Sequence, residues 1–106
     1  MKSQPVEFLE VVEHDLICAQ DFYDSWLTGG ADKFLARFRE TVAWIAWNSG
    51  QFPRKYRRFH RAIIRRTYFG IYFAVEAEIT TVVAVLDMRQ DPRVIRALLK
   101  LRLPPR

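Results

Sequence analysis

The sequence predicts an α+β domain in which a helical hairpin packs on a largely antiparallel four-stranded sheet. Three observations lead to this fold class. Apolar residues recur at intervals of three and four between residues 15 and 48, which is the period of an amphipathic helix. After residue 53 they alternate or run continuously, as they do in strands. The chain has 106 residues and is 50% hydrophobic, which suits one domain over residues 1–106 with a single core.

The first two elements are a strand and a helix. Residues Pro5 to Val12 favour a strand, because β-branched and aromatic residues dominate and proline is tolerated at a first strand position. A helix is expected from Asp15 to about Leu27. Its apolar stripe consists of Leu16, Ala19, Phe22, Tyr23, Trp26 and Leu27. Cys18 lies in this stretch, and without a second thiol or a nearby histidine base we expect it to be a buried structural thiol.

A second helix is expected from Ala31 to about Asn48, after Thr28, Gly29 and Gly30 end the first. Because the connection is so short, the two helices should form an antiparallel hairpin. The apolar stripe of the second helix consists of Phe34, Leu35, Phe38, Val42, Ile45 and Ala46. Trp44 and Trp47 flank this stripe, and we expect them to pack in the core rather than to form an aromatic binding platform.

Strand character begins after the break at residues 48–53. One strand is expected over Tyr56 to Ile64. Its two faces carry Arg57, Phe59, Arg61, Ile63 and Arg65 on one side and Arg58, His60, Ala62 and Ile64 on the other. The next strand is expected over Tyr68 to Val75. The face that should pack under the helices carries Phe69, Ile71, Phe73 and Val75.

The chain closes with a central strand and a basic helix. Residues Ile79 to Leu86 are apolar on both faces, which favours a position inside the sheet. Asp91 and Pro92 are expected as the N-cap and first position of a helix over Pro92 to about Arg102. The order is therefore β-α-α-β-β-β-(α). We expect the last helix to dock on its own sheet or on a partner rather than on a membrane.

Charge is distributed unevenly along the chain. Residues 1–53 contain four basic and eight acidic residues, whereas residues 54–106 contain thirteen basic and four acidic ones. Seven of the basic residues lie between Arg54 and Arg66, a segment without any acid. Such a concentration favours a polyanionic partner over a solvated face that only maintains solubility. Nucleic acid, an anionic membrane and an acidic protein segment are the partner classes that fit.

Missing motifs exclude several kinds of site. The sequence has no glycine-rich phosphate loop, no histidine and cysteine set spaced for zinc, and no serine placed with a histidine and a carboxylate. We therefore expect no cofactor and no metal. No apolar run approaches the roughly 18 residues of a membrane span, and acids occupy the stretch where a signal peptide would be apolar. A cytoplasmic protein without a membrane partner is expected.

The last strand continues into a distinctive segment, VVAVLDMRQDP. Its residues Ala84, Val85, Leu86, Arg89, Asp91 and Pro92, supported by Arg61, Phe69 and Tyr72, resemble the ParE/RelE toxin superfamily of bacterial toxin-antitoxin systems, which includes plasmid stabilisation proteins. The resemblance covers roughly residues 5–95. It implies a small toxin that is held inactive by a cognate antitoxin, and the acidic segments of such antitoxins would suit the basic half of this chain.

The resemblance implies one of two activities. RelE-like members cleave messenger RNA on the ribosome, whereas ParE-like members block DNA gyrase. RNA cleavage through the 2′-hydroxyl needs a base, an acid and positive charge. Many superfamily members have a histidine where this chain has Asp87, and neither histidine nor tyrosine follows Tyr72. His60, the one histidine of the second half, is expected on a solvated strand. Asp87 is expected to orient Arg89 or Arg61.

These departures favour a ParE-like toxin that binds and inhibits gyrase without catalytic residues. The residues expected to contact the target or the antitoxin are Lys55, Arg58, Arg61, Arg65, Arg66, Arg89, Arg93 and Arg96. The alternative is a ribosome-dependent endoribonuclease with Arg61, Arg65 and Arg89 around the scissile phosphate. A third hypothesis is a toxin-fold protein that has lost its activity and remains a binding module.

Overall fold

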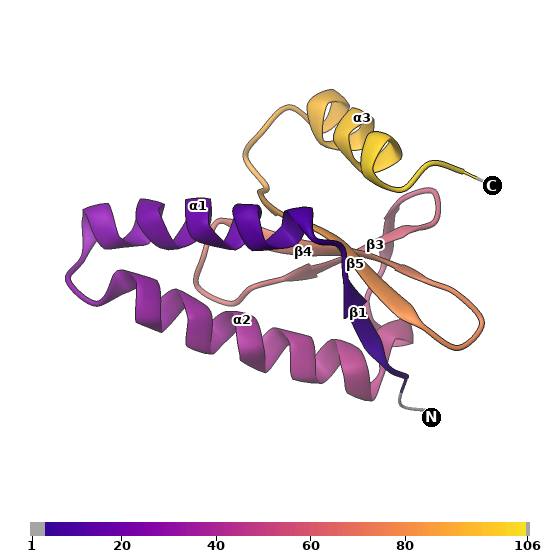
Figure 1. Cartoon of the computed structure of the whole chain (residues 1–106), viewed down its shortest axis with the longest axis horizontal. Helices are drawn as coiled ribbons and strands as arrows, with labels where there is room; N and C mark the ends of the chain where they lie inside the picture. The colour runs from indigo at the N-terminus through magenta and orange to yellow at the C-terminus, as the bar shows by residue number, and fades with distance from the viewer. Residues whose placement is uncertain (1–3, 106) are drawn as a thin grey trace.

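Five strands and three α-helices make up residues 4–105, the part of the chain that this computed structural model describes. Residues 1–3 and 106 of the predicted domain lie outside it. The elements are β1 (Val6–Phe8), α1 (Val11–Trp26), α2 (Gly30–Trp47), β2 (Arg54–Tyr56), β3 (Phe59–Ile63), β4 (Phe69–Val75), β5 (Thr80–Asp87) and α3 (Pro92–Arg102). The sheet order is β1-β5-β4-β3-β2. The hairpin of α1 and α2 covers one face of the sheet, and α3 lies on the other (Figure 1).

The sheet is largely antiparallel, as predicted, but it has five strands rather than four. The single strand expected over residues 56–64 is wrong. The basic segment instead forms two short strands, β2 and β3, with Tyr56 paired to Phe59 across a tight turn. Arg57 has a φ of 50° in this turn, a left-handed conformation that costs an ordinary residue roughly 1–2 kcal/mol. Arginine gives no local signal for such a turn, so the sequence pattern concealed it.

The first strand is shorter than expected, and the first helix begins earlier. Strand β1 ends at Phe8, and α1 already begins at Val11, before the predicted start at Asp15. The backbone N–H of Val12 donates to the Leu9 carbonyl at 3.0 Å, which turns the chain into the helix. Val12 is only 1% exposed, so burial of its side chain outweighs the weak helix preference of a β-branched residue.

Two glycines make the helical hairpin possible. Gly29 has a φ of 77°, a left-handed conformation that glycine adopts without strain. At Gly30, where α2 begins, an added Cβ would lie 2.2 Å from the carbonyl oxygen of Tyr23 on α1. No side chain fits there, because the obstructing atom is backbone. Figure 1 shows α1 and α2 side by side and joined by this turn, which confirms the predicted antiparallel hairpin.

Each face of the sheet has its own apolar core. On the hairpin side, Phe69, Ile71 and Phe73 of β4 pack beneath α1 and α2, as their alternation predicts. On the other side, Ile95 and Leu99 of α3 are buried against the sheet, so α3 docks on its own sheet. The predicted helix over residues 92–102 and its N-cap at Asp91 are also confirmed. None of the helices within residues 4–105 is long and apolar enough to span a membrane.

Strand β5 is central, as predicted, and it contains a bulge. Tyr72 pairs with Ala84 while Phe73 pairs with Val82, so Val83 has no partner opposite it on β4. Strand β1 accompanies β5 only as far as Val82. Beyond that point, two side chains form hydrogen bonds with the backbone of β5 in place of a neighbouring strand.

These side chains are Asp15 of α1 and Arg102 of α3. The Asp15 carboxylate accepts from the Val85 N–H at 2.9 Å, and Arg102 Nη1 donates to the Val83 carbonyl at 3.1 Å. The two side chains also form a forked ion pair, with Nη1 to Oδ2 at 2.6 Å and Nη2 to Oδ1 at 2.9 Å. This buried pair ties α1, β5 and α3 together.

Several side chains expected in the core lie at the surface instead. Trp44 and Trp47 are both 50% exposed and contact each other edge to face, with ring centroids 5.8 Å apart. Trp26, at the end of the α1 stripe, is 72% exposed. Cys18 is exposed rather than buried, and its Sγ lies 3.6 Å from Nε2 of His14, one helical turn earlier. The core stripe of α1 runs through Val12, Asp15 and Ala19, which turns Cys18 outward.

Candidate functional site

Arg89 is held in a fixed orientation just after the end of β5. Asp87 accepts from Arg89 Nε at 3.0 Å and from Nη2 at 2.7 Å, and it also accepts from the Arg89 backbone N–H at 2.9 Å. This confirms the prediction that Asp87 orients Arg89. Paired donation from a guanidinium to a carboxylate fixes both the distance and the plane of the group. With a side chain 53% exposed, Arg89 remains accessible from solvent.

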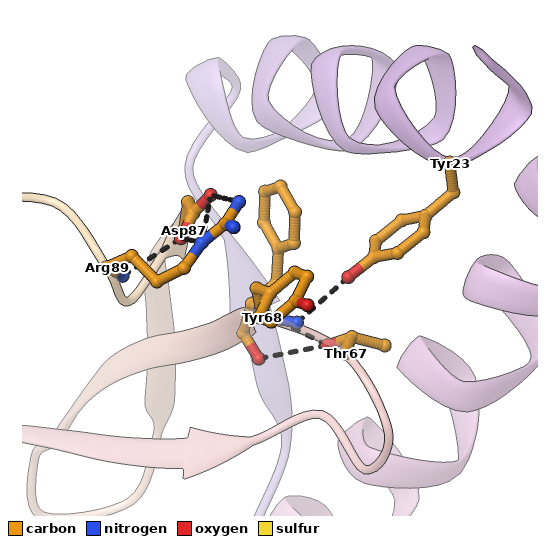
Figure 2. A network of polar contacts seen from close by, with 6 residues as sticks. Tyr23, Thr67, Tyr68, Asp87 and Arg89 are labelled. Carbon is orange, nitrogen blue, oxygen red and sulfur yellow. Dashed lines mark hydrogen bonds and ion pairs between the residues drawn. The ribbon is translucent and has the colours of Figure 1, made fainter. Parts of the chain in front are cut away.

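Aromatic rings also contact the Arg89 guanidinium. Its Cζ lies 3.9 Å from the ring centroid of Tyr68 and 5.7 Å from that of Phe22. Tyr68 is itself anchored, because its backbone N–H donates to the Tyr23 hydroxyl at 2.8 Å. Figure 2 shows Tyr23 reaching from α1 towards the turn before β4, with Arg89 against Tyr68. Three segments distant in sequence therefore build the support of one guanidinium.

The contact between Asp87 and Arg89 favours the charged form of both side chains. The hydrogen bonds from Arg89 lower the pKa of the Asp87 carboxyl below its usual value near 3.8. The same contact raises the pKa of the Arg89 guanidinium. Near neutral pH both groups are ionised, so Asp87 serves as a positioning carboxylate and is not a proton donor.

Arg61 lies on the α3 face of the sheet, directly opposite Tyr72 in the pairing of β3 with β4. Tyr72 is fully buried, and within residues 4–105 its hydroxyl makes no hydrogen bond of regular geometry, although the Arg61 guanidinium lies close enough to interact with it. Burial raises the pKa of the Tyr72 phenol above its usual value near 10, and the attraction of the Arg61 guanidinium offsets only part of this effect. The phenol therefore stays protonated near neutral pH.

The three arginines of the nuclease alternative have different partners. Arg65 forms an exposed ion pair with Glu40 on α2 at 3.4 Å. Arg61 faces Tyr72, and Arg89 is paired with Asp87. Within residues 4–105, no contact joins the three guanidiniums around one common point. Arg66 is exposed in the turn between β3 and β4, with a φ of 61°.

The remaining predicted contact residues gather around α3. Arg58 donates to the carbonyls of Leu103 and Pro104 and so fastens the end of the chain to the β2–β3 turn. Arg93 pairs with Asp91 at 2.9 Å. Lys55 and Arg96 line a hollow between β2 and α3. Arg58 therefore has a structural role that the sequence did not reveal.

His60 is partly buried and packs against Phe73, rather than lying on a solvated strand as predicted. Its Nδ1 lies 2.9 Å from the Phe52 carbonyl, and its ring stacks on Phe73 at 5.2 Å. It is therefore on the hairpin side of the sheet, whereas Arg61 is on the α3 side. Among the described residues, no three histidine, cysteine, aspartate or glutamate side chains converge as metal ligands would.

Several residues that support these contacts belong to no motif of the sequence. The sequence pattern predicts Asp15 only as the start of a helix and Arg102 only as the end of one, whereas in the structure they form the buried ion pair. An acid on the core face of an amphipathic helix was the available signal. The sequence pattern predicts Tyr23 on the apolar stripe of a helix and Tyr68 at the start of a strand. Their contact depends on the turn before β4.

Comparison of the sequence with protein-family models and with curated proteins gave no match. Among solved structures, the chain is similar to one described as the chromosomal ParDE TA system from P. aeruginosa. The TM-score is 0.67 at 18% sequence identity, and the match covers 78% of this chain and 94% of that chain. A TM-score at this level indicates a shared fold despite the low sequence identity. The protein therefore has a ParE-like α+β fold.

Proposed function

We propose that the protein is the toxin of a type II toxin-antitoxin system and that it acts in the cytoplasm by binding and inhibiting DNA gyrase. The ParE-like fold supports the first part of this proposal. The observation that carries the second part is the clamped, solvent-accessible Arg89. A guanidinium whose orientation is already fixed loses little conformational entropy on binding, which suits recognition of a large target.

The titratable groups near the arginines argue against RNA cleavage. A general acid or base works best when its pKa is close to the operating pH. Asp87 has a lowered pKa and Tyr72 a raised one, so neither exchanges a proton readily near neutral pH. His60 lies on the other face of the sheet from Arg61. An inhibitor that acts by binding needs no such group.

The partner that neutralises the toxin is, in this proposal, an antitoxin with an acidic segment. The exposed cations of the second half of the chain provide the complementary charge, with Lys55, Arg65, Arg66, Arg93 and Arg96 at the surface. Coexpression with the small protein encoded beside the gene tests this part. A stable complex that dissociates at high salt is expected, and no association in low salt would contradict it.

The target is tested by induced expression in a bacterial host and by a supercoiling assay with purified gyrase. Growth arrest and inhibited supercoiling are expected. Arg89→Gln should weaken inhibition about tenfold or more, since it removes a central, pre-oriented arginine. Arg39→Gln on the exposed face of α2 removes the same charge far from the cluster and should leave inhibition unchanged.

Two other outcomes would replace this proposal. Normal supercoiling together with new transcript ends after induction would establish the endoribonuclease. Absence of both effects, with tight binding of the neighbouring gene product, would establish an inactive binding module.

A further inference from the structure

A hollow lined by four cations lies between the β2–β3 turn and α3. Its volume is about 260 Å³, and it is lined by Lys55, Tyr56, Arg57, Phe59, Arg96 and Lys100. No carboxylate contributes to the lining. A second hollow of about 350 Å³ shares Arg57, Phe59 and Lys100 with the first. Figure 1 shows the chain after α3 running beside the β2–β3 turn.

Within residues 4–105, the four cations form no ion pair with a carboxylate, whereas four other arginines do. Arg65, Arg89, Arg93 and Arg102 each form an ion pair. Among the described residues, no such pair involves a cation of the hollow. Four like charges around one small space repel each other, and an anion in that space would relieve the repulsion.

The walls of this hollow are held in place by other contacts. Arg57 occupies the left-handed conformation of the tight turn between β2 and β3. Arg58 next to it is bonded to the carbonyls of Leu103 and Pro104, which fixes the turn against the end of α3. Arg96 lies over the Tyr56 ring, with its Cζ 5.6 Å from the centroid. The hollow is therefore largely formed before any ligand enters.

We propose that this hollow binds a chain of linked phosphates, either inorganic polyphosphate or the triphosphate of a nucleotide. Linked phosphates concentrate several negative charges in a small volume, and their oxygens are strong acceptors for arginine and lysine. A nucleic acid strand has one charge for each nucleotide, so roughly one or two of its phosphates would face a hollow of this size. An acidic peptide carries its charges on separate, mobile side chains and matches the compact arrangement less well.

The aromatic lining does not favour recognition of a base. The Tyr56 ring already stacks on Tyr72 with centroids 6.3 Å apart, and Arg96 lies against it as well. Phe59 is only 4% exposed. The Tyr56 ring positions Arg96, and the two rings leave little free surface on which a base could stack. Selectivity therefore comes from the phosphate chain.

The test is titration calorimetry of the purified chain with sodium triphosphate, in low salt and again in physiological salt. Binding at least about tenfold tighter than that of orthophosphate is expected, because linked phosphates engage several cations at once. The Arg96→Gln/Lys100→Gln variant should lose about tenfold or more of this affinity. The matched control, Lys33→Gln/Arg39→Gln, removes one lysine and one arginine from exposed positions on α2 and should bind as the parent does.

The other ligands identify the source of the phosphate chain. Equal affinity for triphosphate and for a nucleoside triphosphate would show that only the phosphate chain is recognised, which supports polyphosphate. Tighter binding of the nucleoside triphosphate would show an additional contact with the nucleoside and would support a nucleotide. An equal loss of triphosphate affinity in both double variants would overturn the proposal, because the overall positive charge of the protein would then explain the binding. Tighter binding of a short oligonucleotide or of polyglutamate would also overturn it. Thermal unfolding of each variant in ligand-free buffer should match that of the parent, because the substituted side chains are exposed.

Discussion

Substitution of Asp15 by alanine should destabilise the protein more than any change at an exposed ion pair. The side chains of Asp15 and Arg102 are 6% and 12% exposed. Removal of the carboxylate leaves the Arg102 guanidinium buried without its counter-ion and the Val85 N–H without its acceptor. Loss of one partner of a buried pair costs about 3–5 kcal/mol of unfolding free energy. This is a large part of the roughly 5–15 kcal/mol that stabilises a domain.

Urea denaturation, followed by circular dichroism, measures this effect. With an m value of roughly 1–1.5 kcal/mol/M for a small domain, the midpoint for Asp15→Ala should fall by about 2–5 M. Glu40→Ala removes the carboxylate of the exposed pair with Arg65 and serves as the control. Its expected change is below about 1 kcal/mol, because water and salt screen an exposed pair.

A double-mutant cycle separates the ion pair from the other losses. The Asp15→Ala/Arg102→Ala variant no longer buries an unpaired charge. Its cost should therefore be at least about 1 kcal/mol smaller than the two single costs added together. A loss below about 1 kcal/mol for Asp15→Ala, or strictly additive costs in the cycle, would show that the pair does not stabilise the fold as argued.

Three further predictions concern individual contacts. Arg89→Gln should raise the pKa of the Asp87 carboxyl towards 3.8 in an NMR titration. The lowered pKa stabilises the fold above that value and the effect is lost as pH falls through the folded pKa, so this variant should lose less stability in acid. Tyr72→Phe removes a buried hydroxyl whose contact with Arg61 falls short of a regular hydrogen bond, so the unfolding free energy should stay within about 1 kcal/mol of that of the parent. Gly30→Ala should lower the unfolding free energy by about 1–3 kcal/mol, whereas Gly50→Ala, with its nearest atom at 3.5 Å, should have little effect.

Local patterns in the sequence predicted the class and order of most elements. The helix over residues 92–102 was placed correctly because Asp91 and Pro92 form a local start signal. The alternation of Phe69, Ile71 and Phe73 identified the face beneath the helical hairpin. These features depend on neighbours within a few residues, which is the range over which periodicity and capping act.

Local patterns also misplaced some features. The turn between β2 and β3 is made by a left-handed arginine, and Trp44 and Trp47 lie outside the core despite their apolar rings. In each case the outcome depends on whether another part of the chain packs against the segment. A propensity or a period describes what a segment can bury and does not specify whether a neighbour covers it.

Periodicity and composition alone were enough to predict the fold class, the order of most elements and the concentration of positive charge after residue 53. Which of these charges are paired depends on how the elements pack. The tertiary structure pairs Asp15 with Arg102 across 87 positions of the chain, clamps Arg89 between Asp87 and Tyr68, and leaves the cations beside α3 without carboxylate partners among the described residues. Charge is a property of each residue, whereas its neutralisation depends on distance in space, and distance is set by how the sheet and helices pack.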